Sequence, residues 1–228
     1  AVGGATDLGI AVDGLTTVVN AFGSDVISVG EASDIIFTAV KGGKTTVEQL
    51  SKAMFNVAPI AASMGIEFGN VTAAVATLTA SGTPTSVAMT QIRAALSELA
   101  KPTSKVSKLF TELTGKSFEE FIASGGDMKE GFDLIKAGAE KNGKPLAEYV
   151  GSVEALGAIQ TLTGKGSEKF ANEIIAAANS VGATDEAFAQ GSKGIGLVLE
   201  KLQAAFSVLQ IEIGQKLAPL LIEAIDKI

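Results

Sequence analysis

Short helical segments, separated from one another by glycine or proline, constrain the fold of this 228-residue chain more than any other feature. Apolar residues recur at spacings of three and four, which is the period of an α-helix with one buried face. Sustained alternation of β-branched residues is absent, although residues 115–128 can accommodate either a short hairpin or, through Phe118, Phe121 and Ile122, one or two helical turns. The pattern therefore predicts an all-α fold: a compact multi-helix domain over residues 1–190, followed by a long amphipathic helix over residues 191–228.

Cap and break signals place the expected helices. Thr45 and Glu48 fit a capping box, and Thr83 and Thr103 are expected as N-caps of later helices. Pro59 predicts a kink or break in the helix that precedes it. The remaining expected helices cover residues 6–22, 29–40, 67–81, 128–141 and 167–180, and the signals are weak between 115 and 166.

The C-terminal stretch differs in kind, because its apolar residues form a continuous seam. Spacings of three and four favour a coiled coil, while extra steps of four around Gly214 and Pro219 loosen the supercoil locally. Two interpretations stay open: the seam packs on its own domain, or it pairs with another copy and continues as a coiled coil in a longer protein. The expected self-association seam consists of Leu199, Leu202, Phe206, Leu209, Ile213, Leu217 and Leu221.

The chain lacks the residues that most enzymes use. It has no His and no Cys, which excludes Ser-His-Asp and Cys-His arrangements and metal sites built on imidazole or thiolate. Gly43-Lys44-Thr45 and Gly115-Lys116-Ser117 resemble the end of a phosphate-binding loop, but Thr38 and Phe110 stand where the motif needs another Gly. We therefore expect no catalytic residue, no cofactor, no metal site and no enzymatic activity.

Charge argues against specific nucleic-acid recognition. The net charge is −7, and Arg93 is the single arginine, whereas readers of base sequence use Arg forks on a basic face. Lys101, Lys105 and Lys108 are best interpreted as a solvated helix face. Arg93 is expected in an internal ion pair or a helix-end contact, and the scattered carboxylates are expected at the surface.

Several stretches resemble one family. The Pro59-x-Ala61-x-x-x-Gly65 element, with a Leu-Ala-Lys-Pro-Thr ending at 99–103 about forty residues later, is similar to the conserved core of phage tail tape-measure proteins. The parts that carry the resemblance are residues 46–50, 57–66, 72–78, 90–96 and 99–103. Residues 155–177 and 217–221 agree more loosely, and residues 115–150 depart most from the family pattern.

The resemblance implies a structural role in a phage or prophage tail. Tape-measure proteins lie along the tail lumen and govern tail length, and they leave ahead of the DNA during ejection. Their partners are the tail-tube protein, tail-tip proteins and tail-assembly chaperones, with membrane contact during ejection. Such a protein is made in the host bacterial cytoplasm and ends in the virion. We expect the chain to be one segment of a longer polypeptide.

A membrane-active helical domain, such as a pore-former or translocator, is the alternative. A mean hydropathy of +0.35 and the apolar seam motivate it. Charged residues nevertheless interrupt every apolar tract before it reaches the roughly 18–20 residues that a membrane span requires.

Overall fold

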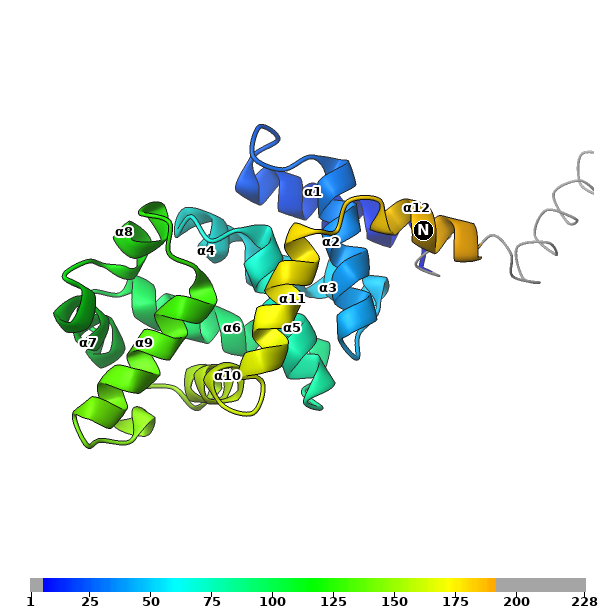
Figure 1. Cartoon of the computed structure of the whole chain (residues 1–228). Coiled ribbons are helices and arrows are strands. Elements are labelled where there is room, and N and C mark those ends of the chain that lie inside the picture. The colour runs from blue at the N-terminus through cyan, green and yellow to red at the C-terminus, as the bar shows by residue number, and fades with distance from the viewer. Residues whose placement is uncertain (1–5, 192–228) are drawn as a thin grey trace, which may run out of the picture.

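The computed structural model describes residues 6–191, and all regular structure in this range is helical (Figure 1). The all-α prediction is confirmed for this part of the chain. The helices, of which η1 and η2 are 3-10 turns, are α1 Leu8–Phe22, α2 Val29–Gly42, α3 Val47–Ala53, η1 Met54–Asn56, α4 Ala58–Ser63, α5 Phe68–Ala80, α6 Thr85–Ala100, α7 Lys105–Thr114, α8 Phe118–Ala123, α9 Met128–Lys141, η2 Leu146–Glu148, α10 Val153–Thr163, α11 Ser167–Ala178 and α12 Ala183–Gly191.

Helix α5 forms the centre of the fold. Its residues from Asn70 to Thr79 are all buried, because α2, α11, α6 and α10 pack around it. A helix covered on all sides must satisfy its polar groups internally, and the hydroxyls of Thr72 and Thr77 donate to carbonyls of the preceding turn. Its small residues allow neighbouring helices to approach closely.

Helices α7, α8 and α9 form the end of the molecule that lies far from α12 (Figure 1). Four phenylalanines fill the space between them. The ring centroids of Phe110 and Phe118 lie 5.1 Å apart, those of Phe110 and Phe121 5.3 Å apart, and those of Phe118 and Phe132 6.2 Å apart. The buried apolar residues continue from this cluster into α6 and α10, so the described chain shares one hydrophobic core.

Glycine and proline break the helices where the sequence predicts. Helix α3 ends at Ala53, a single 3-10 turn follows, and α4 begins with Pro59 in its first turn. Gly65, which follows α4, has a φ of +70°, in the left-handed region that favours glycine. The break predicted at Pro59 is thus confirmed.

The cap of α3 is shifted by one residue from the prediction. Thr46, rather than Thr45, accepts a hydrogen bond from the Gln49 N–H. The Thr45 hydroxyl instead lies 2.8 Å from the hydroxyl of Thr85 in a buried contact between the α2–α3 loop and the start of α6. Two consecutive threonines offer the same local signal, and the tertiary contact decides which one caps.

Two other predicted caps are also displaced. Ser104, rather than Thr103, caps α7, and its hydroxyl also donates to the carbonyl of Glu98 at the end of α6. At the start of α6, Pro84 occupies the cap position that Thr83 was expected to take, and no side chain there bonds the first turn.

The hairpin considered for residues 115–128 is wrong, because this stretch contains helix α8. Ser117 and Glu120 form a capping box at its start, and Gly115 reverses the chain before it with a φ of +72°. The one or two helical turns expected from Phe118, Phe121 and Ile122 are thus confirmed, and the Ser-x-x-Glu spacing is a further local helix signal.

Two described helices, α10 and α12, were not predicted as separate elements. Helix α10 begins after Ser152, where the carboxylate of Glu98 accepts hydrogen bonds from the N–H groups of Gly151 and Ser152 at 2.8 and 2.7 Å. Residues 192–228, with the whole predicted seam, lie outside the described residues.

Candidate functional site

The two stretches that resemble phosphate loops are helix junctions. In the first, the Gly43 N–H donates to Ala39 O and the Lys44 N–H donates to the Thr79 hydroxyl. In the second, Gly115 ends α7 and Ser117 begins α8. The backbone donors of Gly43 and Lys44 are therefore occupied within the protein, and neither junction follows a strand.

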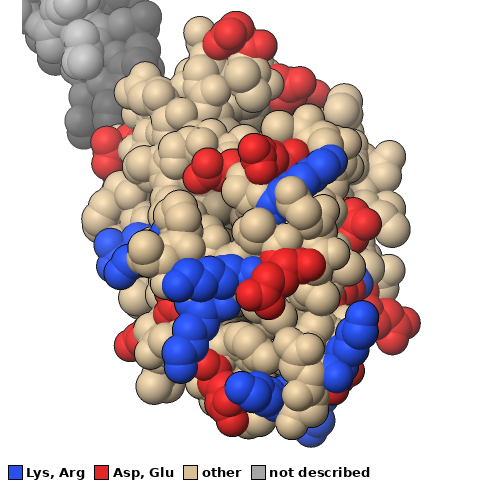
Figure 2. Space-filling view, turned by 90° about the vertical axis from the view of Figure 1, so that its left-hand side faces the viewer, with Lys and Arg blue, Asp and Glu red and all other residues tan. Residues whose placement is uncertain are grey.

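The acidic side chains of the described range form no metal-binding cluster. Within residues 6–191, the acidic side chains nowhere gather in a group of three or more that could hold a metal ion. The lysines of α7 are exposed, as expected, and Figure 2 shows lysines and carboxylates interspersed on this side of the molecule. Arg93 is exposed on α6, and none of the ion pairs within residues 6–191 includes it, so the internal ion pair, one of the two contacts expected for Arg93, is wrong for this range.

No helix between residues 6 and 191 has both the length and the apolar character that crossing a bilayer demands.

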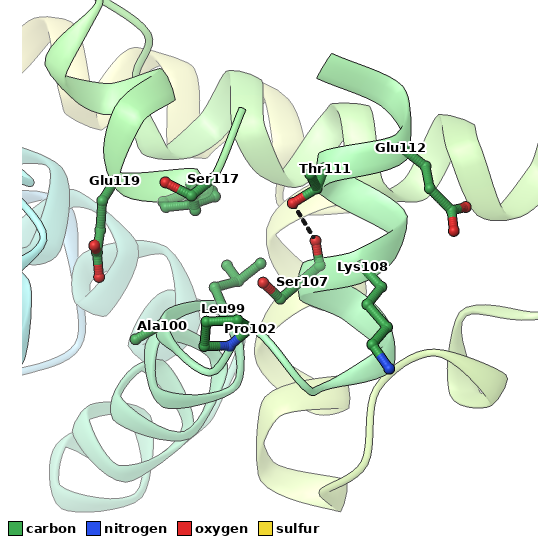
Figure 3. Close-up of a pocket in the computed structure, with 10 residues that line it drawn as sticks. Leu99, Ala100, Pro102, Ser107, Lys108, Thr111, Glu112, Ser117 and Glu119 are labelled. Atoms are coloured by element: carbon green, nitrogen blue, oxygen red, sulfur yellow. Dashed lines mark hydrogen bonds between the residues drawn. The ribbon is translucent and has the colours of Figure 1, made fainter. Parts of the chain in front are cut away.

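A first cleft lies where the end of α6 meets α7 and the start of α8 (Figure 3). It has a volume of about 390 Å³, and Leu99 and Pro102 form one wall. Lys108 and Glu112 project from α7 and Glu119 from α8, so its rim carries both signs of charge. The hydroxyl of Thr111 is occupied by a hydrogen bond to the carbonyl of Ser107 at 3.0 Å.

A second hollow, which we call the Gly65 groove, lies between the α1–α2 loop, the α4–α5 turn and the end of α11. It has a volume of about 480 Å³, and its lining includes Val26, Ile35, Gly65, Ile66, Ile174 and Val181. A smaller hollow of about 160 Å³ shares Gly65, Ile66, Glu67 and Asn70 with it and continues to the α8–α9 turn at Asp127.

Polar contacts hold α12 against α2. The carboxylate of Asp34 accepts hydrogen bonds from the N–H groups of Gly182 and Thr184 at 2.9 and 2.8 Å, and the hydroxyls of Thr184 and Ser33 lie 3.0 Å apart. Asp34 thus serves from another helix as the cap that α12 lacks in its own sequence. Further along α2, Lys41 pairs with Glu186 of α12 at 2.5 Å.

Both carboxylates of this junction favour their charged form. Partial burial by itself would raise the pKa of Asp34, but hydrogen bonds from Thr184 and Gly182 outweigh it and leave the pKa below its ordinary 3.8. The hydrogen bond from Lys41 lowers the pKa of Glu186. Since the apolar contacts of α12 come from Ala183 and Ala187, the charged contacts carry much of its attachment.

We expect α12 to detach in acid before the core unfolds. A carboxyl whose pKa is lowered by folding stabilises the fold above its unfolded pKa, and that contribution disappears as the pH falls below 3.8 through the folded pKa of Asp34. Hydrogen exchange, corrected for intrinsic rates, should show protection of α12 amides that holds at about pH 6 and falls as the pH drops below 4.5 and 3.8, the ordinary pKa values of Glu186 and Asp34, while α5 stays protected. Asp34→Asn should expose α12 already at pH 6, whereas Asp13→Asn on the surface of α1 should not. If α5 and α12 lost their amide protection over the same pH range, this expectation would be contradicted.

Comparison with known proteins identifies the family. The model of the family described as phage-related minor tail protein matches residues 1–151. The chain belongs to this family. The chain is 32% identical over 220 residues to a probable tape measure protein of Clostridium phage phiCD119, and 27% identical over 227 residues to the tape measure protein of Pneumococcus phage Dp-1. No solved structure matches it.

The two matches cover nearly all of this chain but a small part of each relative. They span 94% and 97% of the minor tail protein chain, against 23% of the phiCD119 protein and 20% of the Dp-1 protein. The chain therefore spans about a fifth to a quarter of the length of these curated relatives.

Both hollows border stretches that carry the family resemblance. The Pro59–Gly65 element forms α4 and the turn beneath the Gly65 groove, and the Leu99–Thr103 element ends α6 beside the first cleft. Sequence reasoning did not anticipate the groove, because Val26 and Val181 lie in ordinary loops and meet only through the packing of α2, α5 and α11. The predicted seam residues belong to the part outside the described range.

Proposed function

We propose that this chain is a segment of a tape-measure protein that governs tail length and takes part in DNA ejection. The observation that carries the proposal is the match over nearly the whole chain to two proteins named as tape measure proteins. The all-helical fold of residues 6–191 agrees with it. The proposed role is structural, without catalysis.

Within the parent protein, residues 6–191 serve as an interaction domain rather than as part of the ruler. A continuous helix converts chain length into distance at about 1.5 Å per residue, but here glycine and proline fold the chain back on itself around α5. The partners that this role requires are the tail-tube protein, the tail-tip proteins and the assembly chaperones. Its place in the virion is the tail lumen.

The predicted amphipathic segment, in this proposal, follows the compact domain, whose last described helix, α12, ends at Gly191, so the proposed domain boundary lies near residue 190. The seam from Leu199 to Leu221 pairs copies of the chain, because its three- and four-residue spacing suits a coiled coil.

The pairing has a direct test. We expect the chain to sediment as a dimer or larger species, and Leu202→Asp with Leu209→Asp to reduce it to a monomer, because each change places a carboxylate in the apolar seam. Exposed Val153→Asp should leave the sedimentation coefficient unchanged. A monomeric wild-type chain at tens of micromolar would refute the pairing.

Virion composition tests the wider proposal. Peptides from residues 6–191, found by mass spectrometry in purified tails together with peptides of a parent chain several times longer, are the expected result. Tails that lack them would refute the proposed function.

A further inference from the structure

The Gly65 groove leaves apolar side chains in water at its rim. Val26 is 70% exposed and Val181 is 89% exposed, and they lie on loops from opposite parts of the sequence. Below them, Ile35, Ile66 and Ile174 line the hollow. Burying this apolar surface under another chain is favourable, since apolar area removed from water is the main driving force of association.

Among residues 6–191, every charged residue that lines the groove and its continuation is acidic. Glu31 and Glu67 lie along the groove and Asp127 at the far end of the adjoining hollow, and no Lys or Arg of this range lines either one. Hydrogen bonds from Ser28 lower the pKa of Glu31, which keeps it charged. Neither Glu31 nor Glu67 forms an ion pair with another residue of the described range.

The cleft between α6 and α8 provides the contrast within the same molecule. It is of similar size, about 390 Å³, yet Lys108 lies among its carboxylates. An uncompensated acidic rim around an apolar floor is therefore a property of the Gly65 groove and not of every hollow on this acidic protein.

From the exposed apolar side chains and the acidic rim, we propose that the Gly65 groove binds an apolar, Lys- or Arg-bearing segment of a partner protein. Apolar side chains of the partner fill the floor between Val26 and Val181, and its cations pair with Glu31 and Glu67. Such charge complementarity selects the partner and orients it. The inference rests on the proposed function only in placing that partner within the tail assembly.

Charge argues against two other occupants. Residues 192–228 carry four acidic residues and four lysines, so they offer no positive excess to the acidic rim. A second copy of the chain brings a net charge of −7. A basic segment of a different protein fits the rim better than either.

Binding of two synthetic peptides by the full chain tests the proposal. Both are labelled amphipathic peptides with the same leucine pattern, one carrying lysines and the other glutamates, and fluorescence anisotropy measures their Kd. The Leu/Lys peptide should bind and the Leu/Glu peptide should not. Failure of the Leu/Lys peptide to bind, or equal binding of both, overturns the proposal.

Matched variants locate the site. Glu31→Gln with Glu67→Gln should weaken Leu/Lys binding about three- to tenfold, as expected for the loss of two exposed ion pairs. Glutamine can still complete the capping box at Ser28, so the fold is retained. Glu112→Gln with Glu119→Gln removes the same charge at the other cleft and should change the Kd less than about twofold. Equal effects of the two pairs would show nonspecific attraction and overturn the site.

The apolar contribution has its own control. Val26→Ser with Val181→Ser should weaken binding about tenfold, while Val87→Ser with Val153→Ser, at exposed positions outside the groove, should not. If Leu202→Asp with Leu209→Asp tightens peptide binding, residues 192–228 occupy the groove and the partner assignment is wrong. These outcomes do not depend on virion composition, so a failure here is distinct from a failure of the proposed function.

Discussion

Phe110→Ala is expected to lower the free energy of unfolding by about 3–5 kcal/mol, because it opens a cavity where a fully buried ring packs in the aromatic cluster. The Phe110 side chain is 0% exposed and its ring contacts both Phe118 and Phe121. For a domain of this size the loss corresponds to a fall in Tm of roughly 10 °C. Urea unfolding followed by circular dichroism measures it, since the chain has no Trp.

Phe55→Ala is the matched control for this change. Phe55 lies on η1 with 63% of its surface exposed, so the same truncation should cost less than about 0.5 kcal/mol. If both variants lost the same free energy of unfolding, Phe110 would not be buried as described, and the packing of α7, α8 and α9 would be wrong.

Gly14→Ala should destabilise the protein by about 1–3 kcal/mol, although alanine favours helices, because it forces two helices apart. A Cβ at Gly14 in α1 would lie 2.4 Å from Cβ and 2.7 Å from Cα of Ser51 in α3. Backbone at that distance cannot yield without moving α3. The urea midpoint should therefore fall.

Gly30→Ala should have the opposite sign. In α2 the added Cβ would meet only the Ser28 hydroxyl, at 3.9 Å, so the lower entropy of the unfolded chain should raise stability by up to about 1 kcal/mol. Should Gly14→Ala also stabilise, the close approach of α1 and α3 would be refuted.

Local sequence signals predicted much of the fold. Helix α9 covers residues 128–141 as expected, and α5 ends just before Gly82, whose φ of +102° agrees with the end of the helix expected over residues 67–81. Apolar spacing and glycine position act within one turn of the helix, so a single sequence reveals them.

The errors arise where distant residues decide the local structure. The start of α10 has a local cap in Ser152 but is also held by Glu98, more than fifty residues earlier, and α12 is held by Asp34, about 150 residues earlier. Both carboxylates lie outside the helices that they hold. The Gly65 groove was beyond prediction for the same reason, since its walls come from three separate parts of the chain.

Tail length tests most directly the claim that residues 6–191 form an interaction domain and not a ruler. As one continuous helix these residues would extend roughly 280 Å, whereas a packed domain of this size is roughly 40 Å across. We predict that deleting them in frame from the parent gene shortens the assembled tails, measured by electron microscopy, by no more than roughly 40 Å. An equal-length deletion from a continuous helical stretch of the parent should remove roughly 280 Å. Tails shortened by the full helical length when residues 6–191 are deleted would contradict the account.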